Sequence, residues 1–172
     1  MHDEFAAVVT WLPFELHPEY PPEGISRDVL RARYGAGIDA HTRELFERNG
    51  LAWGASEHIP NSIDALRVTE LARDRGVHDA LHDRLMAAYW EHGENIGEHD
   101  VLRAHADAVG LAREDVDRVL SGDEYLERVR VSTQQAQSLG ISGIPAFLID
   151  SRLLVLGAQP RESFARAFAQ LS

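Results

Sequence analysis

The residues best placed to take part in chemistry lie near the C-terminus, in the run Ser142, Gly143, Ile144 and Pro145. The Ile–Pro bond stands directly before an apolar run, Ala-Phe-Leu-Ile at 146–149. A bond of this kind is ordinarily trans, because only roughly 5–6% of X–Pro bonds in folded proteins are cis. Proline is also common at the start of an edge strand. On spacing alone, the motif predicts the beginning of a strand and no particular reaction.

Composition excludes several kinds of chemistry for these 172 residues. There is no cysteine, which excludes disulfides, thiolate zinc sites and thiol redox steps carried out by these residues alone. All 17 basic residues are arginine, so a lysine Schiff base is excluded as well. The formal net charge is −11, which argues against nucleic acid as a partner because a duplex-binding surface usually needs a basic patch.

Histidines are the other candidate ligands. Nine are present, and His78 and His82 stand four residues apart, so they can share one face of a helix. No His-Glu-x-x-His run occurs. We therefore interpret the histidines as solvated helix positions and predict no metal site.

The elements that must position the C-terminal motif can be predicted from hydrophobic periodicity. Residues 5–12 (Phe-Ala-Ala-Val-Val-Thr-Trp-Leu) are β-branched and aromatic, which indicates a buried strand. A proline-rich loop follows, and then a series of amphipathic segments bounded by glycine or by Ser, Asn and Asp caps. Two short apolar strands at 146–149 and 153–156 flank a polar turn, which is typical of a β-hairpin. The helices predicted are 27–34, 39–48, 61–75, 79–92, 98–109, 113–120, 124–139 and 160–171. This order favours an α/β sheet domain with a helical insertion.

The wider sequence resembles a known family. Ser-Gly-Ile-Pro-Ala-Phe at 142–147, followed by Gly-Ala-Gln-Pro at 157–160, is similar to the C-terminal half of DsbA-family thioredoxin folds. The segment at 11–18, Pro-Asn-Ser at 60–62 and the segment at 89–97 resemble the FrnE-like branch, the cytoplasmic dithiol-disulfide oxidoreductases. The resemblance covers about residues 10–171. It implies a thioredoxin-like part at 1–25 and 140–172, with a helical insertion at 26–139 that includes the connecting helix 124–139.

The resemblance also implies roles for particular residues. Pro145 is expected to be cis, with the backbone of Ile144 offered to an extended substrate and Gly143 allowing close approach. Asn61 is expected at the same cleft, with a plain helix cap as the alternative interpretation. The implied activity is thiol-disulfide exchange through a mixed disulfide, with a thiol or disulfide protein or a small thiol as the substrate. No resident cofactor is expected, although glutathione or another small thiol stays open as a ligand.

Two features depart from the family pattern. Leu66 stands where the family usually has histidine. More importantly, a first strand, a Cys-x-x-Cys turn and a first helix are expected before the segment at 8–11, yet this segment almost directly follows Met1. The first strand is therefore predicted to be missing, and the catalytic cysteines are expected upstream of Met1. A misplaced start codon, a degraded gene, or a slot filled by a rearranged segment or another chain would each account for this.

Alternatives follow from the same resemblance. The chain as it stands is expected to be redox-inactive. One alternative is a glutathione-dependent isomerase or transferase, related to 2-hydroxychromene-2-carboxylate isomerase and kappa-class glutathione transferase. Another is a non-catalytic peptide- or thiol-binding relic. We expect a cytoplasmic location, because the acidic N-terminus has no signal-peptide pattern, and no membrane partner. An isolated sheet edge makes a homodimer plausible.

Overall fold

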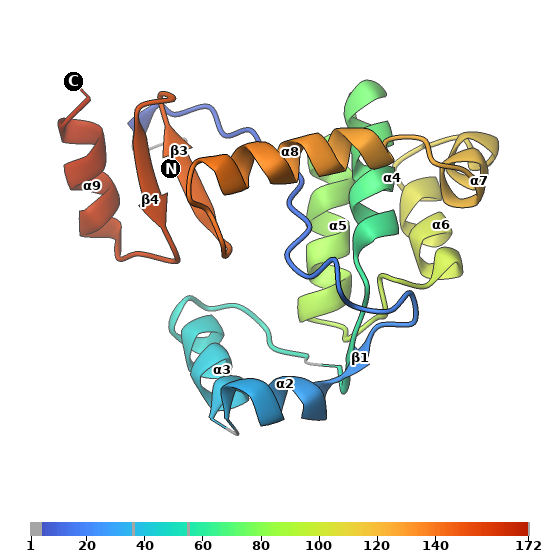
Figure 1. The fold of residues 1–172 in the computed structure, drawn as a ribbon, viewed down its shortest axis with the longest axis horizontal. Helices are drawn as coiled ribbons and strands as arrows, with labels where there is room; N and C mark the ends of the chain where they lie inside the picture. The colour runs from blue at the N-terminus through green and yellow to red at the C-terminus, as the bar shows by residue number, and fades with distance from the viewer. Residues whose placement is uncertain (1–4, 36, 55, 172) are drawn as a thin grey trace. The chain divides into compact units, whose positions relative to one another are not determined.

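The computed structural model describes residues 5–35, 37–54 and 56–171, and the chain divides into two compact units (Figure 1). The smaller unit combines Met1–Leu16 with Arg130–Ser172, and the larger unit is His17–Val129. These divisions fall between residues 16 and 17 and between 129 and 130, whereas the sequence led us to expect them after residues 25 and 139.

The larger unit is helical and contains the main apolar core. Four helices, α4 to α7, contact one another, and the completely buried side chains Leu71, Leu81 and Leu102 lie among them. Within α4, the buried Val68, Leu71 and Ala72 recur at intervals of three and four residues, which places one apolar face of the helix toward its neighbours. Strands β1 (Ile25–Ser26) and β2 (His58–Ile59) form a short antiparallel pair outside this core. The helices of the unit are α2 (Arg27–Tyr34), α3 (Ile38–Arg48), α4 (Ile63–Asp74), α5 (His78–Trp90), α6 (His99–Asp107) and α7 (Arg113–Ser121), and α8 (Leu126–Ser138) begins in it.

A buried arginine, Arg67, connects segments that apolar packing of the helices does not hold together by itself. The side chain of Arg67 on α4 is only 5% exposed. Its guanidinium donates to the backbone carbonyls of Val119, Gly122 and Glu124, which lie at the end of α7 and in the turn that follows. It also donates to Asp64 at 2.7 Å. Because one buried side chain donates to all three of these carbonyls, Arg67 fixes the α7–α8 connection against α4.

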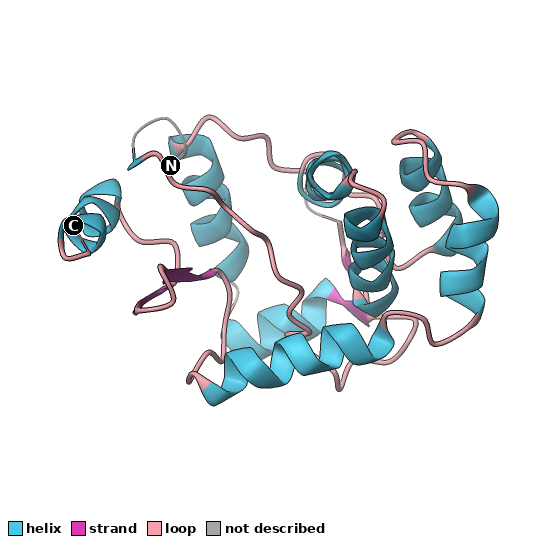
Figure 2. Ribbon diagram, turned by 90° about the horizontal axis from the view of Figure 1, so that it is seen from above, coloured by secondary structure: helices cyan, strands magenta, loops and turns pink. Residues whose placement is uncertain are grey.

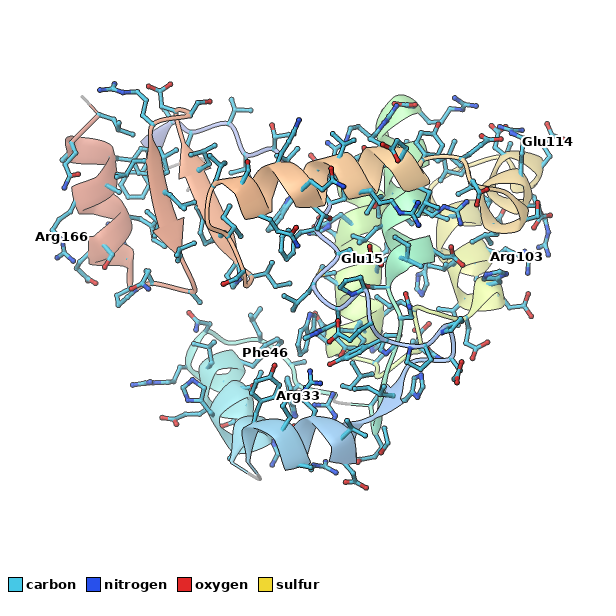
Figure 3. The ribbon with its side chains drawn as sticks, viewed as in Figure 1. Glu15, Arg33, Phe46, Arg103, Glu114 and Arg166 are labelled. Carbon is cyan, nitrogen blue, oxygen red and sulfur yellow. The ribbon has the colours of Figure 1, made fainter. Side chains whose placement is uncertain are left out.

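Two further links within this unit start from Arg103 and Phe46, which are labelled in Figure 3. Arg103 on α6 donates from Nε to Asp117 on α7 at 2.6 Å, which ties these neighbouring helices together. Phe46 on α3 lies against Trp53 and Trp90, with ring centroids 5.1 and 5.2 Å away. The guanidinium of Arg27 stands 5.7 Å from the Trp53 ring centroid, a cation–π distance. An aromatic cluster therefore holds α3 and its following loop.

The smaller unit is built on one β-hairpin. Strand β3 (Ala146–Ile149) pairs antiparallel with β4 (Leu153–Leu156), in a register that joins Ala146 to Leu156. The turn uses Asp150 and Ser151 in the left-handed region, with φ of 52° and 55°. Helix α9 (Arg161–Ala169) contacts β4, and Phe164 of α9 meets Phe147 edge-on at 4.9 Å between ring centroids. Both hairpin strands were predicted within these bounds, and the prediction is confirmed.

The strand predicted over 5–12 is wrong. Residues 6–12 have no regular secondary structure, and the segment is drawn as a loop in Figure 2. Val8 is 88% exposed and Leu12 is 73% exposed, whereas a buried strand was expected. The segment is attached at its ends: Phe5 stacks on Phe168 of α9 at 4.5 Å between ring centroids, and the Glu15 N–H donates to Thr133 Oγ1 of α8 at 2.9 Å.

The physical reason is that a strand needs a neighbour to take up its backbone hydrogen bonds. Within the described residues, the hairpin forms a sheet of two strands, and neither strand pairs with residues 6–12. β-propensity alone does not produce a strand, because it reflects packing against cross-strand neighbours. Without a pairing strand among the described residues, this apolar segment forms no strand.

Replacing Arg67 by leucine should destabilise the protein strongly. The change leaves three backbone carbonyls and Asp64 without their donor, and an unmade buried hydrogen bond costs roughly 1–3 kcal/mol per group. We expect a loss of about 3–5 kcal/mol in the free energy of unfolding, measured by urea denaturation. Arg75→Leu is the matched control, because Arg75 is 48% exposed and its ion pair with Asp115 should contribute under about 1 kcal/mol. Equal losses for the two variants would contradict this role of Arg67.

Stability should fall as the pH decreases below about 6.5, and His82 should account for part of this change. Burial, together with the neighbouring His78 ring 5.9 Å away, lowers the pKa of His82 below its ordinary value. Between that lowered pKa and the ordinary one, the unfolded chain binds more protons than the folded chain, so acid favours unfolding. Urea midpoints at pH 7.5 and 5.5 should therefore differ less in His82→Gln than in the unchanged protein. The exposed His41, replaced in the same way, should leave the difference unchanged.

Candidate functional site

The loop between α8 and β3 carries the motif singled out in the sequence. Helix α8 is followed by Gly140 with φ of 81°, and the buried Ile141 then anchors the chain by donating its N–H to Ala136 at 3.1 Å. Glycine suits this position because the left-handed conformation costs it little. Residues 142–145 after the anchor are all exposed. The Ile144–Pro145 peptide bond is cis, which confirms the expectation from the family resemblance.

The two halves of the motif meet across the hairpin. The N–H of Gly157 donates to the carbonyl of Pro145 at 2.8 Å. Gly157 has φ of 77°, a conformation that favours glycine, and the chain then turns toward Pro160, the N-cap of α9. This bond extends the β3–β4 ladder by one pair beyond the strands themselves. This hydrogen bond therefore joins the Gly-Ala-Gln-Pro run to the Ile-Pro run in the folded structure.

The backbone beside Pro145 is available to a ligand. In the part of the chain that the structure describes, the N–H and C=O of Ile144 enter no hydrogen bond, and the Ile144 side chain is 57% exposed. A Cβ built on the neighbouring Gly143 would meet no atom within 4 Å. An exposed pair of backbone groups beside open space can accept an extended peptide by strand-like hydrogen bonding. The structure thus brings Gly143, Ile144 and Pro145 together as one exposed surface.

Asn61, the fourth predicted site residue, lies in the larger unit and uses its side chain locally. Its Nδ2 donates to the Tyr20 carbonyl at 2.9 Å, and its Oδ1 accepts from the Ile63 N–H at 3.0 Å. The second bond caps α4, a task that the adjacent Ser62 does not perform with its side chain. Asn61 therefore uses its side chain for local bonds at the start of α4, and its role toward a substrate stays a prediction.

Sequence reasoning missed a contribution from Gln159. Its Nε2 donates to the Leu156 carbonyl at 2.8 Å, at the end of β4. The hairpin register could have pointed to this residue. Pairing residue 146 with 156 places 157 opposite 145, so Gln159 follows shortly after the last residue of β4. Around the hairpin turn, Asp150 and Arg152 form an exposed ion pair at 3.7 Å, which contributes little stability.

The described residues contain no group of three or more His, Cys, Asp or Glu side chains arranged to hold a metal ion. Stacked His78 and His82 are engaged within α5 and its surroundings: His78 contacts Arg73 and Asp79 through its two ring nitrogens. Of the helices in the described ranges, none has both the length and the apolar character that crossing a bilayer demands. The site is therefore described as an exposed backbone surface, and none of these 172 residues is a cysteine.

Comparisons with known proteins agree with this geometry. A solved structure described as a "probable DsbA oxidoreductase", SCO1869 from Streptomyces coelicolor, is 30% identical with a TM-score of 0.82, over 91% of this chain and 72% of that one. A solved 2-hydroxychromene-2-carboxylate isomerase is 15% identical with a TM-score of 0.79, over 99% of this chain and 84% of that one, which shows the shared fold. The uncharacterized protein YwbO of Bacillus subtilis is 24% identical, over 94% of this chain and 80% of its own length.

The family model of the DSBA-like thioredoxin domain matches residues 3–169, nearly the whole chain. The hairpin, the cis Ile144–Pro145 bond and the helical insertion are the features that the resemblance led us to expect, and each is present. This chain therefore belongs to the DsbA-like thioredoxin-domain family.

Proposed function

We propose that this chain carries the substrate-holding part of a dithiol-disulfide oxidoreductase. The observation that carries the proposal is the exposed backbone of Ile144 beside the open Gly143 in a DsbA-like domain. An extended peptide would donate to and accept from Ile144, while its cysteine lies beside Pro145. Resemblance to the FrnE-like branch supports cytoplasmic action on a thiol or disulfide protein, or on a small thiol such as glutathione.

The exchange step itself needs a thiolate, because thiol-disulfide exchange proceeds by thiolate attack on a disulfide sulfur. These 172 residues contain no cysteine. The attacking thiol must then come from a partner or from a segment outside these residues. What this chain contributes is orientation: it holds the substrate backbone in an extended conformation, which lowers the entropy cost of reaction.

The 172-residue chain alone should not accelerate thiol-disulfide exchange. We expect the rate of insulin reduction by dithiothreitol to be the same with and without the protein, because no residue of the chain can form the mixed disulfide. Turbidity of the precipitating insulin B chain reports the rate. An acceleration would contradict our assignment of these residues to substrate holding alone.

Substituting Gly143 by valine should weaken peptide binding at least about tenfold while leaving folding intact, a loss of about 1.4 kcal/mol. The new side chain meets no protein atom at its Cβ position, yet it occupies the space through which a peptide backbone must approach Ile144. Titration calorimetry with S-carboxymethylated insulin B chain measures the affinity, and thermal unfolding checks the fold.

Gly37→Val is the matched control, since a Cβ there also meets nothing within 4 Å. It should leave the affinity unchanged. A second titration, with reduced glutathione, distinguishes the class of ligand. Binding of glutathione in preference to the peptide would favour the glutathione-dependent isomerase or transferase alternative. Binding of the peptide that is insensitive to Gly143→Val would place the peptide elsewhere and overturn the proposed site.

A further inference from the structure

The segment that carries the proposed substrate surface is uncharged. Residues 140–149, which include Gly143, Ile144 and Pro145, contain no Asp, Glu, Arg, Lys or His. The groups offered to a ligand there are the N–H and C=O of Ile144, and any extended peptide can pair with them whatever its side chains. Contacts with this segment therefore do not distinguish a cationic peptide from an anionic one.

The larger unit is strongly acidic by contrast. It contains 23 acidic residues and 13 arginines, a net charge of −10 with histidine neutral. The smaller unit contains five acidic residues and four arginines, a net charge of −1. Since the chain joins the two units after residue 16 and again after residue 129, a ligand of the hairpin always approaches a molecule that carries this negative charge.

Ion pairs within the larger unit engage its arginines but leave many carboxylates free. Eleven of the 13 arginines contact a carboxylate. Fourteen of the 23 carboxylates contact an arginine or a histidine, and the nine that remain enter no ion pair among the described residues. All nine belong to exposed residues. The surface charge that is not compensated locally is therefore predominantly negative.

These nine carboxylates are dispersed over the larger unit. They extend from Glu23, before β1, to Glu127 on α8, and include Glu47 on α3, Asp83 on α5 and Glu114 on α7, which is labelled in Figure 3. Charge dispersed in this way acts through the field that it produces around the molecule, and not through contact with one bound cation. Such a field raises the rate at which oppositely charged ligands arrive and lowers the rate for ligands of like charge.

We propose that the ligands of the Ile144 surface are cationic peptides, selected as they approach the protein and not by charged contacts once they are bound. This inference rests on the proposed function, because it concerns the ligand of the same surface. Its consequence is a split between two rate constants: charge on the peptide changes association and leaves dissociation unchanged. Salt removes the difference, because the Debye length falls from about 30 Å at 0.01 M to about 3 Å at 1 M.

Stopped-flow fluorescence measures both rate constants with two peptides that differ only in charge. Both contain a fluorescent label and the core Ala-Val-Cys-Val-Ala with an S-methylated cysteine, and they carry either two lysines or two glutamates at each end. At an ionic strength of about 10 mM, the lysine peptide should associate at least about tenfold faster than the glutamate peptide. Their dissociation rates should agree within about twofold. The ratio of association rates should approach one in about 1 M sodium chloride.

Reversing two free carboxylates tests the source of the field. Asp83→Arg with Glu91→Arg changes the charge of the larger unit from −10 to −6, at two exposed positions. Because the logarithm of the association ratio scales roughly with the charge of the protein, a tenfold ratio should fall to about fourfold. Glu44→Arg with Arg48→Glu is the control, since it reverses both members of an exposed ion pair and keeps the charge at −10. This exchange should leave the ratio unchanged.

Equal association rates at low salt, or a ratio that salt does not change, would overturn the proposal. So would an effect of peptide charge on dissociation, since it would reveal charged contacts in the bound state. The salt series on the unchanged protein decides the question if the reversed variant does not fold. Gly143→Val separates the two proposals. Equal association rates for peptides whose binding this variant weakens contradict the field alone, whereas binding that the variant does not weaken contradicts the proposed substrate surface.

Discussion

The hydrogen bond from the Gly157 N–H to the Pro145 carbonyl is the interaction on which the smaller unit depends. It joins the two ends of the hairpin and continues the pairing of β3 with β4 past the strands. By taking the Pro145 carbonyl inward, it also determines which backbone groups of β3 face outward. The outward direction of the Ile144, Ala146 and Leu148 backbone groups follows from this one alternation.

The larger unit depends on a different kind of constraint. Its helices bury a continuous apolar core, but the connections between them contain backbone carbonyls that also need partners. Arg67 satisfies three of these carbonyls from a position that is itself buried. A long cationic side chain can do this because its donors are spread over a planar fork. The helical unit therefore keeps its shape through hydrogen bonds, in addition to apolar burial.

The helices and the hairpin could be predicted because their signals are local. Arg27–Tyr34 begins after Ser26, whose hydroxyl accepts from the Asp28 N–H as a cap residue should, and it ends at Gly35. Cross-strand pairing in the hairpin is set by a turn between strands that are adjacent in the sequence. Residue type alone is a poorer guide to burial: Met86 on α5 is apolar, yet it is 38% exposed.

The sequence by itself determined the absence of a thiol among these residues, because that depends on residue identity alone. Through the resemblance carried by its motifs, it also predicted the family and the cis Ile144–Pro145 bond. Tertiary structure alone decided what became of residues 6–12 and of Asn61. A strand exists only when a neighbour accepts its hydrogen bonds, so the segment at 6–12 forms no strand among the described residues despite its strand-forming composition. An amide side chain forms hydrogen bonds with the backbone groups near it, and for Asn61 these are the Tyr20 carbonyl and the Ile63 N–H.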